Sequence, residues 1–131
     1  LLIATALDRS ALYDLHQAAT ELGLGCLVEV YTFDDLDKVD FDQVRLLGVN
    51  NRDLRTFEVD IDNSLRIFAE VPRGVGRIAE SGLSEPEQLV RLRRHGVHGV
   101  LIGETFMRAD DPGEALRSLR SAAKELAMQG G

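Results

Sequence analysis

The sequence predicts an α/β fold that is built around one parallel β-sheet. Short apolar runs begin near residues 1, 26, 46, 77 and 99, roughly 20 to 31 residues apart. Segments with helical periodicity separate these runs, and strands that alternate with helices are typical of parallel βαβ units. The runs are almost continuously apolar, which favours a sheet whose two faces are both covered.

The first three expected strands are residues 1–6, 26–30 and 46–49. Asp8 is the expected N-cap of a helix that follows the first strand and ends near Gly23 and Gly25. One face of this helix is apolar, at Leu12, Leu15, Ala19 and Leu22. After the second strand, residues 33–39 are expected to form one or two helical turns.

The last two expected strands are residues 77–80 and 100–103. A helix is expected over residues 60–70, burying Leu65, Phe68 and Ala69. Ser84 and Glu87 have the spacing of a capping box and predict the start of the next helix. A last helix opens at residue 111 and is expected to turn four residues inward, namely Leu116, Leu119, Ala123 and Leu126.

Two architectures satisfy this pattern: an open doubly wound sheet, or part of a (β/α)₈ barrel. Five units in 131 residues are about half of a whole barrel, which needs about 250 residues. The sequence starts with an apolar run and without a methionine, whereas natural termini are usually polar. We therefore expect a single domain over residues 1–131 that is a truncated part of a longer protein.

The composition argues against several classes of partner. There are 15 Lys and Arg against 22 Asp and Glu, a formal net charge of −7, and this acidic balance disfavours nucleic acids and anionic membranes. No apolar run approaches the roughly 20 residues that cross a bilayer. Cys26 is the only cysteine, so an intramolecular disulfide is impossible, which fits a reducing compartment.

No metal or nucleotide cofactor is expected. The three histidines and Cys26 show no spacing typical of metal ligands. Neither GxGxxG nor a Walker A motif is present.

Polar residues and glycines stand where the expected strands end, and the carboxyl ends of parallel strands are where such folds bind ligands. The candidate site residues are Glu29, Asn50, Arg52, Glu80, Ser81, Gly82, Ile102, Gly103 and Glu104. A carboxylate facing a barrel interior is partly desolvated, which raises its pKa toward the range of acid–base catalysis. The glycine turns at residues 81–82 and 102–103 predict a phosphate site.

Simpler readings exist for each of these residues. Glu29 can be a structural ion-pair partner, and Asn50 with Asn51 can form a turn. Arg52 can pair with Asp53 or Glu80 instead of binding a carboxylate or phosphate.

Residues 48–60 read GVNNRDLRTFEVD and closely resemble indole-3-glycerol phosphate synthases. AESGL at residues 79–83 and VLIGETFMR at residues 100–108 also resemble this family. The last two stretches are shared loosely with related phosphate-binding barrels, including phosphoribosylanthranilate isomerase, which is a weaker alternative. The resemblance implies part of a (β/α)₈ TIM barrel, from the fourth barrel strand to the final helix, with strands 1–3 absent.

The family closes the ring of a carboxyphenylaminodeoxyribulose phosphate with loss of CO₂ and water, in tryptophan synthesis and without a cofactor. By resemblance, Glu29 is the catalytic carboxylate that works with a lysine acid, and Asn50 and Glu80 bind and orient the substrate. Arg52 supports that network, and four residues lie at the substrate and phosphate end: Ser81, Gly82, Gly103 and Glu104.

The sequence departs from the family pattern at Glu104, where some members carry Ser. A carboxylate near a phosphate would contribute only its backbone N–H, so we expect its side chain to point away.

The resemblance also places the family's catalytic lysines on strands that precede residue 1, and the only lysines here are Lys38 and Lys124. We therefore expect that the chain is inactive alone and that it needs the missing half of the barrel or self-associates. The expected compartment, by default, is the cytoplasm. The alternative is a non-catalytic half-barrel that binds phosphate or assembles.

Overall fold

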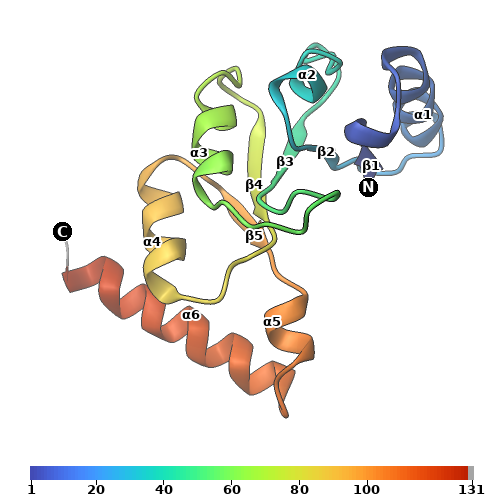
Figure 1. The fold of residues 1–131 in the computed structure, drawn as a ribbon. Helices are drawn as coiled ribbons and strands as arrows, with labels where there is room; N and C mark the ends of the chain where they lie inside the picture. The colour runs from blue at the N-terminus through green and yellow to red at the C-terminus, as the bar shows by residue number, and fades with distance from the viewer. Residues whose placement is uncertain (130–131) are drawn as a thin grey trace.

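A single five-stranded parallel sheet forms the centre of the computed structural model, which describes residues 1–129. The strands are β1 (Leu2–Ile3), β2 (Val28–Val30), β3 (Leu46–Asn50), β4 (Gly76–Glu80) and β5 (Gly99–Leu101). Their spatial order, β1-β2-β3-β4-β5, is the order of the sequence (Figure 1). A doubly wound sheet reverses its strand order at a switch point. The uninterrupted order therefore favours the second predicted architecture and is consistent with a partial (β/α)₈ barrel.

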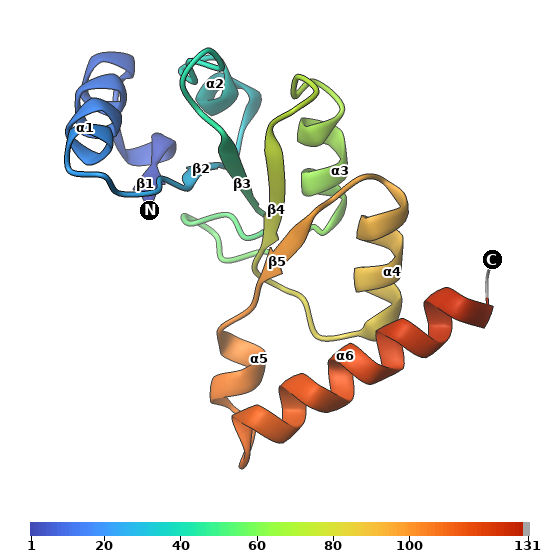
Figure 2. The same cartoon turned by 180° about the vertical axis from the view of Figure 1, so that it is seen from behind.

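The helices follow the strands along one side of the sheet, and α1 to α4 lie side by side in chain order in both views (Figures 1 and 2). They are the 3₁₀ helix η1 (Ala4–Ala6) and the α-helices α1 (Arg9–Glu21), α2 (Phe33–Leu36), α3 (Asp62–Phe68), α4 (Pro86–Arg94), α5 (Glu104–Met107) and α6 (Pro112–Gln129). The last of these packs against α4 and α5. Within residues 1–129, none of these helices has the length and hydropathy needed to cross a membrane.

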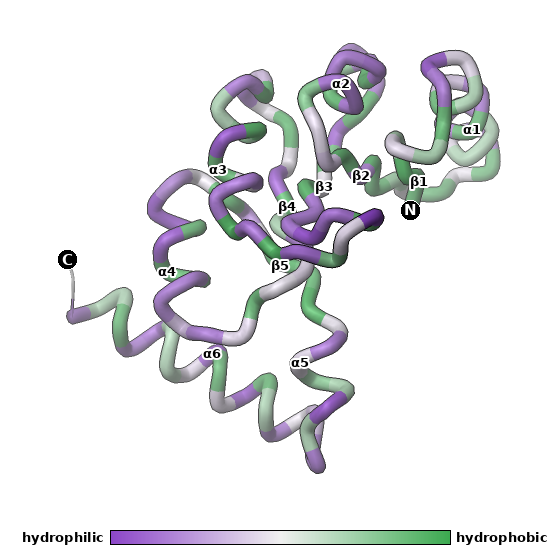
Figure 3. The backbone as a smooth tube through the Cα atoms, in the orientation of Figure 1, coloured by the Kyte–Doolittle hydropathy of each residue, from purple (hydrophilic) through white to green (hydrophobic). Residues whose placement is uncertain are grey.

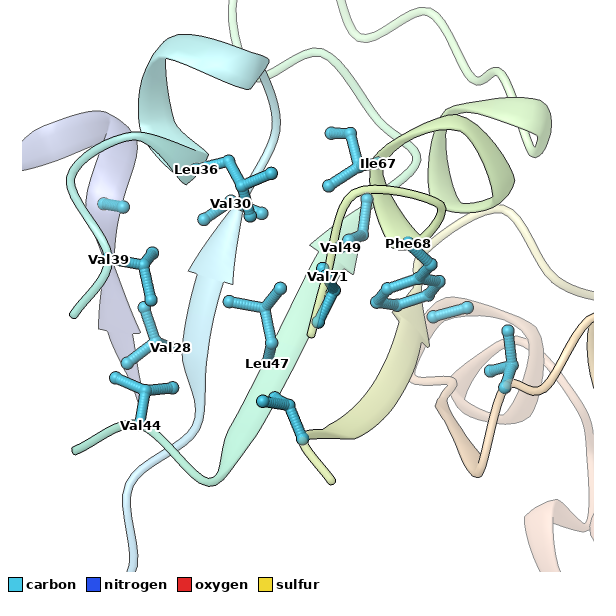
Figure 4. Packing of buried hydrophobic residues seen from close by; sticks show 14 of the residues in the cluster. Val28, Val30, Leu36, Val39, Val44, Leu47, Val49, Ile67, Phe68 and Val71 are labelled. Carbon is cyan, nitrogen blue, oxygen red and sulfur yellow. The ribbon is translucent and has the colours of Figure 1, made fainter. Parts of the chain in front are cut away.

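The hydrophobic core lies between the sheet and these helices (Figure 4). On β2 and β3, Val28 pairs with Leu47 and Val30 with Val49, and all four side chains are fully buried. The helices cover them with buried apolar residues that include Leu12, Leu36, Ile67, Phe68 and Leu92. Burying one such side chain stabilises the fold by about 1.5–3 kcal/mol. Because side chains alternate along a strand, the residues between these valines and leucines lie on the opposite face.

The predicted parallel α/β fold is confirmed. The differences are at the ends of elements and at α5, a four-residue helix that was not predicted. The first strand ends at Ile3 because β1 pairs with β2 at only two positions, and residues 4–6 form a 3₁₀ turn instead. Thr5 in this turn donates a hydrogen bond to Asp35 Oδ2 (2.6 Å). The capping box of α4 is formed by Glu85 and Gln88, one residue beyond the predicted pair.

Some predicted helix faces are only partly buried. Asp8 caps α1 as predicted, accepting a hydrogen bond from Ala11 N (2.8 Å), but Leu15 is 45% exposed. In α6 the backbone alternates between hydrophilic and hydrophobic colours (Figure 3), and the predicted inward residue Leu116 is half exposed. In α3 the buried residues are Ser64, Ile67 and Phe68, whereas Ala69 is exposed.

Candidate active site

Three polar side chains occupy the face of the sheet that lies opposite the core. Glu29 comes from the middle of β2, Asn50 ends β3 and Glu80 ends β4. They are buried, with exposed fractions of 7%, 6% and 3%. Glu29 pairs with Gly48 and Asn50 pairs with Glu80 in the strand register, which brings the three predicted catalytic residues into one cluster.

The side chain of Asn50 is held in one orientation by its neighbours. Its Nδ2 donates a hydrogen bond to Glu29 Oε1 (3.2 Å), and its Oδ1 accepts one from the backbone N–H of Arg52 (2.9 Å). Asn63 on α3 supports the same strand end, since its Nδ2 donates to the carbonyls of Asn50 (3.0 Å) and Tyr31 (2.9 Å). Asn50 therefore presents a fixed donor to the Glu29 carboxylate.

Glu80 has a strongly raised pKa. Burial raises its pKa from 4.5 to about 8, because the charged form loses its hydration. The neighbouring Glu29 adds to the shift through a side-chain hydrogen bond and through charge repulsion. The positive Leu1 amino group acts in the opposite direction and is the smallest of these effects. Glu80 is thus a neutral hydrogen-bond donor at pH 7, next to the side chain of Glu29.

A buried pair of residues anchors the loop that follows β3. Asn51 is fully buried, and its Oδ1 accepts hydrogen bonds from Ser64 Oγ (2.7 Å) and Ser64 N (3.2 Å). Its Nδ2 donates to the carbonyl of Ser81 (3.3 Å) at the end of β4. Sequence reasoning treated Asn51 only as a turn residue and missed Ser64. The available signal was a serine three residues before Ile67, a helical spacing that places it on the buried face.

The remaining predicted residues line one cavity of about 380 Å³ at the carboxyl ends of β4 and β5. Its walls include Arg52, Glu80, Ser81, Gly82, Ile102, Gly103 and Glu104. Ser81 and Gly82 both have positive φ angles, 66° and 70°. A Cβ at Gly82 would lie 2.2 Å from Val59 Cγ1, so only glycine allows the β3–α3 loop to pack here.

Glu104 is oriented by two arginines at this cavity. Its carboxylate accepts a hydrogen bond from Arg52 Nη2 (2.6 Å) and pairs with Arg108 Nη2 (2.8 Å). The side chain is therefore directed toward Arg52 on the β3–α3 loop, and Glu104 is one of the residues that line the cavity. Its orientation relative to a bound phosphate stays a prediction.

A larger cavity of about 660 Å³ lies between α1 and residues 38–44 and contains none of the predicted site residues. Over residues 1–129, no three His, Cys, Asp or Glu side chains gather in a way that could hold a metal ion.

Comparison with known proteins identifies the family of this chain. The family model for indole-3-glycerol phosphate synthase matches residues 1–119. The chain belongs to the indole-3-glycerol phosphate synthase family. The matched range contains every predicted site residue and reaches into α6.

Two relatives carry the same name. The indole-3-glycerol phosphate synthase of Salinibacter ruber (strain DSM 13855 / M31) is 70% identical over 129 residues, which are 98% of this chain and 48% of that protein. The protein of that name from Bacteroides thetaiotaomicron is 41% identical over 122 residues, 93% of this chain and 46% of that protein. The chain thus spans about half the length of these relatives, in their carboxy-terminal part.

Among solved structures, a chain of the Amycolatopsis orientalis BexX/CysO complex matches with a TM-score of 0.65 at 14% identity. The match covers 92% of this chain and 50% of that chain. At this identity the likeness supports the fold alone.

The lysines of this indole-3-glycerol phosphate synthase family member lie away from the cluster. Lys38 Nζ donates hydrogen bonds to the Ala4 carbonyl (2.8 Å) and to Asp35 Oδ1 (3.1 Å). Lys124 is exposed on α6. Neither amine therefore stands at the strand end where Glu29 and Glu80 meet.

Proposed function

We propose that this chain supplies the carboxy-terminal half of an indole-3-glycerol phosphate synthase active site. The reaction would convert 1-(2-carboxyphenylamino)-1-deoxyribulose 5-phosphate to indole-3-glycerol phosphate, with ring closure and loss of CO₂ and water. The observation that carries the proposal is the buried cluster of Glu29, Asn50 and Glu80 beside a glycine-walled cavity. In this proposal β1 corresponds to the fourth barrel strand and β5 to the eighth.

The three polar residues divide the acid–base work. Glu29 acts as the carboxylate that accepts protons during ring closure and dehydration, and Asn50 holds it in place through its amide. Glu80 is neutral at pH 7 because of its raised pKa, so it can donate a hydrogen bond to a substrate hydroxyl or carbonyl oxygen. Because Glu80 is neutral, the pair avoids the repulsion that two charged carboxylates would suffer.

The cavity at β4 and β5 would receive the phosphate. Ser81, Gly82 and Gly103 bring backbone N–H groups to its wall with little side-chain bulk. Arg52 is the cation of the cavity, and its ion pair with Glu104 is partly exposed to solvent. An exposed ion pair is weak, so a phosphate with two negative charges can take the place of Glu104 on Arg52.

The proposed cycle needs a lysine as general acid, and within residues 1–129 neither lysine lies at the cluster. A general acid must approach the reacting atom to about 3 Å, and Lys38 is held by Ala4 and Asp35 instead. We therefore propose that the isolated chain binds but does not turn over substrate, and that lysines on a preceding half of the barrel complete the site. Exposed apolar residues on β5, Val100 (38%) and Leu101 (50%), support such an association at one edge of the sheet. The proposed compartment is the cytoplasm.

A complementation assay tests this function. The chain is mixed with the amino-terminal half of the Salinibacter ruber relative, and indole fluorescence is followed after addition of the substrate. The chain contains no tryptophan, so the product stands out over a weak tyrosine background. We expect turnover only in the mixture, and its loss with Glu29→Gln but not with the exposed control Glu87→Gln.

Two outcomes would contradict the proposal. Turnover by the chain alone that Glu29→Gln leaves unchanged would show that the missing lysine is not essential. A mixture that is folded by circular dichroism but shows no turnover would favour the second candidate, a non-catalytic half-barrel that binds phosphate or assembles, which the exposed edge of β5 also fits.

A further inference from the structure

Glycine occupies the centre of the buried strand β3. Gly48 lies on β3 between Leu47 and Val49, whose side chains are fully buried. Glycine weakens a strand interior because it has no side chain to pack and loses more backbone entropy on folding. A glycine at such a position usually marks a site where another group approaches the backbone closely.

The group that approaches Gly48 is the carboxyl of Glu80. A Cβ at position 48 would lie 1.8 Å from Glu80 Oε1 and 2.9 Å from Glu80 Cδ. Glu80 pairs with Asn50 in the register, two residues beyond Gly48. Its side chain therefore leans back across β3 to lie over the glycine.

Gly48 also lies beside Glu29, which is its register partner on β2. Glu29 and Glu80 are thus on strands that are separated by β3, and their side chains can meet only across that strand. Glu80 reaches Glu29 by lying over Gly48. Any side chain at this position would overlap the Glu80 carboxyl and would also come within 3.3 Å of Leu27 Cδ1.

We infer that Gly48 is a positioning residue, whose missing side chain lets the Glu80 carboxyl cross β3 and lie against Glu29. The inference deepens the proposed function, since it concerns the same acid pair, and it rests on that function for its catalytic meaning. Over residues 1–129, no group donates a hydrogen bond to the buried Glu80 Oε1. Packing, and not a hydrogen bond, therefore holds this oxygen in place.

Other strand glycines do not have this role. Gly99 on β5 pairs with Ile78, and a Cβ there would meet only the tip of that side chain, Ile78 Cδ1, at 3.0 Å. Such a flexible end can shift by a few tenths of an ångström. At Gly48 the Glu80 oxygen would have to move by about 1.6 Å to reach the 3.4 Å of ordinary contact.

The test is an NMR titration of the Glu80 carboxyl carbon in the 131-residue chain and in its Gly48→Ala variant. Displacement from Glu29 toward solvent removes both causes of the raised pKa, so the Glu80 midpoint should fall by about one pH unit or more. The matched control Gly99→Ala should keep the midpoint of the parent chain. The charged groups that act on Glu80, namely Glu29 and the Leu1 amino group, are unchanged in both variants. A Gly48→Ala midpoint equal to that of the parent would overturn the inference.

A second pair of variants covers the case in which Gly48→Ala does not fold. Removing the obstructing carboxyl with Glu80→Ala should restore folding to Gly48→Ala, as measured by circular dichroism and urea unfolding. A double variant that remains unfolded would also overturn the inference, since the defect would then lie elsewhere than at Glu80.

Activity in the complemented enzyme separates this inference from the proposed function. A misplacement of about 1 Å can reduce turnover by about 100-fold, so Gly48→Ala should lower kcat at least tenfold while Gly99→Ala does not. An inactive parent mixture would contradict the proposed function but would leave the titration result standing. Full kcat in Gly48→Ala with a normal Glu80 midpoint would contradict the positioning role alone.

Discussion

Replacing Glu80 with glutamine should change the pH dependence of stability more than any other substitution in the acid cluster. Below pH 4.5 the Glu80 carboxyl is neutral in both the folded and the unfolded chain. Above that pH the unfolded chain releases the proton, whereas the folded chain retains it until about pH 8, because burial and Glu29 raise the pKa there. The stability of the folded chain therefore falls as the pH rises through this window.

The size of the effect follows from the pKa difference. Each pH unit inside the window costs about 1.4 kcal/mol, so the chain should lose up to about 4 kcal/mol of unfolding free energy between pH 5 and pH 8. Glu80→Gln keeps the shape and stays neutral, and it should lack this loss. The lowered pKa values of Asp35, Asp53 and Asp60 affect stability only in more acidic solution, because those gains are lost as the pH falls below 3.8.

Urea unfolding at pH 5 and pH 8 measures this difference, with circular dichroism as the signal. Glu87→Gln, on the exposed side of α4, serves as the control and should follow the parent chain. Equal pH slopes in the parent and in Glu80→Gln would refute the reasoning. A Glu80→Gln variant that is less stable by the same amount at both pH values would show that the shape of the hydrogen bonds matters and ionisation does not.

Three further substitutions test the core, the loop anchor and the cavity. Leu12→Ala should cost about 2–5 kcal/mol of unfolding free energy. Leu15→Ala, at a residue that is 45% exposed, should cost less than about 1 kcal/mol. Equal costs in urea unfolding would show that α1 does not bury Leu12 as described. Asn51→Ala removes the short hydrogen bond of the buried Ser64 hydroxyl (2.7 Å) and leaves it only the longer one to the Val49 carbonyl (3.5 Å). This should cost about 2–3 kcal/mol, and a neutral result in thermal unfolding would contradict the anchoring role. Arg52→Gln should change stability by less than about 1 kcal/mol because its ion pair is partly exposed. It should nevertheless raise the substrate KM of the complemented enzyme about tenfold. An unchanged KM would contradict the proposal that Arg52 binds the phosphate.

The sequence was informative where a single local pattern decides the structure. Apolar runs of strand length predicted all five strands, and the runs of β2 and β3 are the ones whose apolar residues are almost all buried. The ends of the strands were harder to predict. The apolar run at residues 1–6 continues from β1 into the 3₁₀ turn at residues 4–6, so the pattern alone does not show where the strand ends. What ends β1 after Ile3 is the loss of pairing with β2, which depends on a strand about 25 residues away. The helix α5 was missed because it has only four residues and no side-chain cap.

The candidate site could be predicted as a set of strand-end residues but not as an arrangement. Glu29, Asn50 and Glu80 stood out because polar residues interrupt or end apolar runs. The roles of Gly48, Asn63 and Ser64 depend on which residues the register and the packing of α3 bring into contact. A pattern along one segment carries no information about such contacts.

The two faces of the sheet have opposite effects on stability. On the helix side, every buried valine and leucine stabilises the fold. The opposite face buries two acids, an amide and an unpaired Glu80 oxygen. Each of these polar groups lowers stability when it lacks a full set of hydrogen-bond partners. Stability therefore does not explain why two acids on either side of β3 are buried and approach each other over a glycine. A chain with neutral or apolar residues at these positions would fold at least as well above pH 5. Residues that lower stability and still gather on one face of the sheet are expected where function, and not folding, selects them. The same reasoning implies that substitutions at Glu80 can raise stability at pH 8 while they lower catalysis, and that opposition distinguishes a functional carboxyl from a structural one.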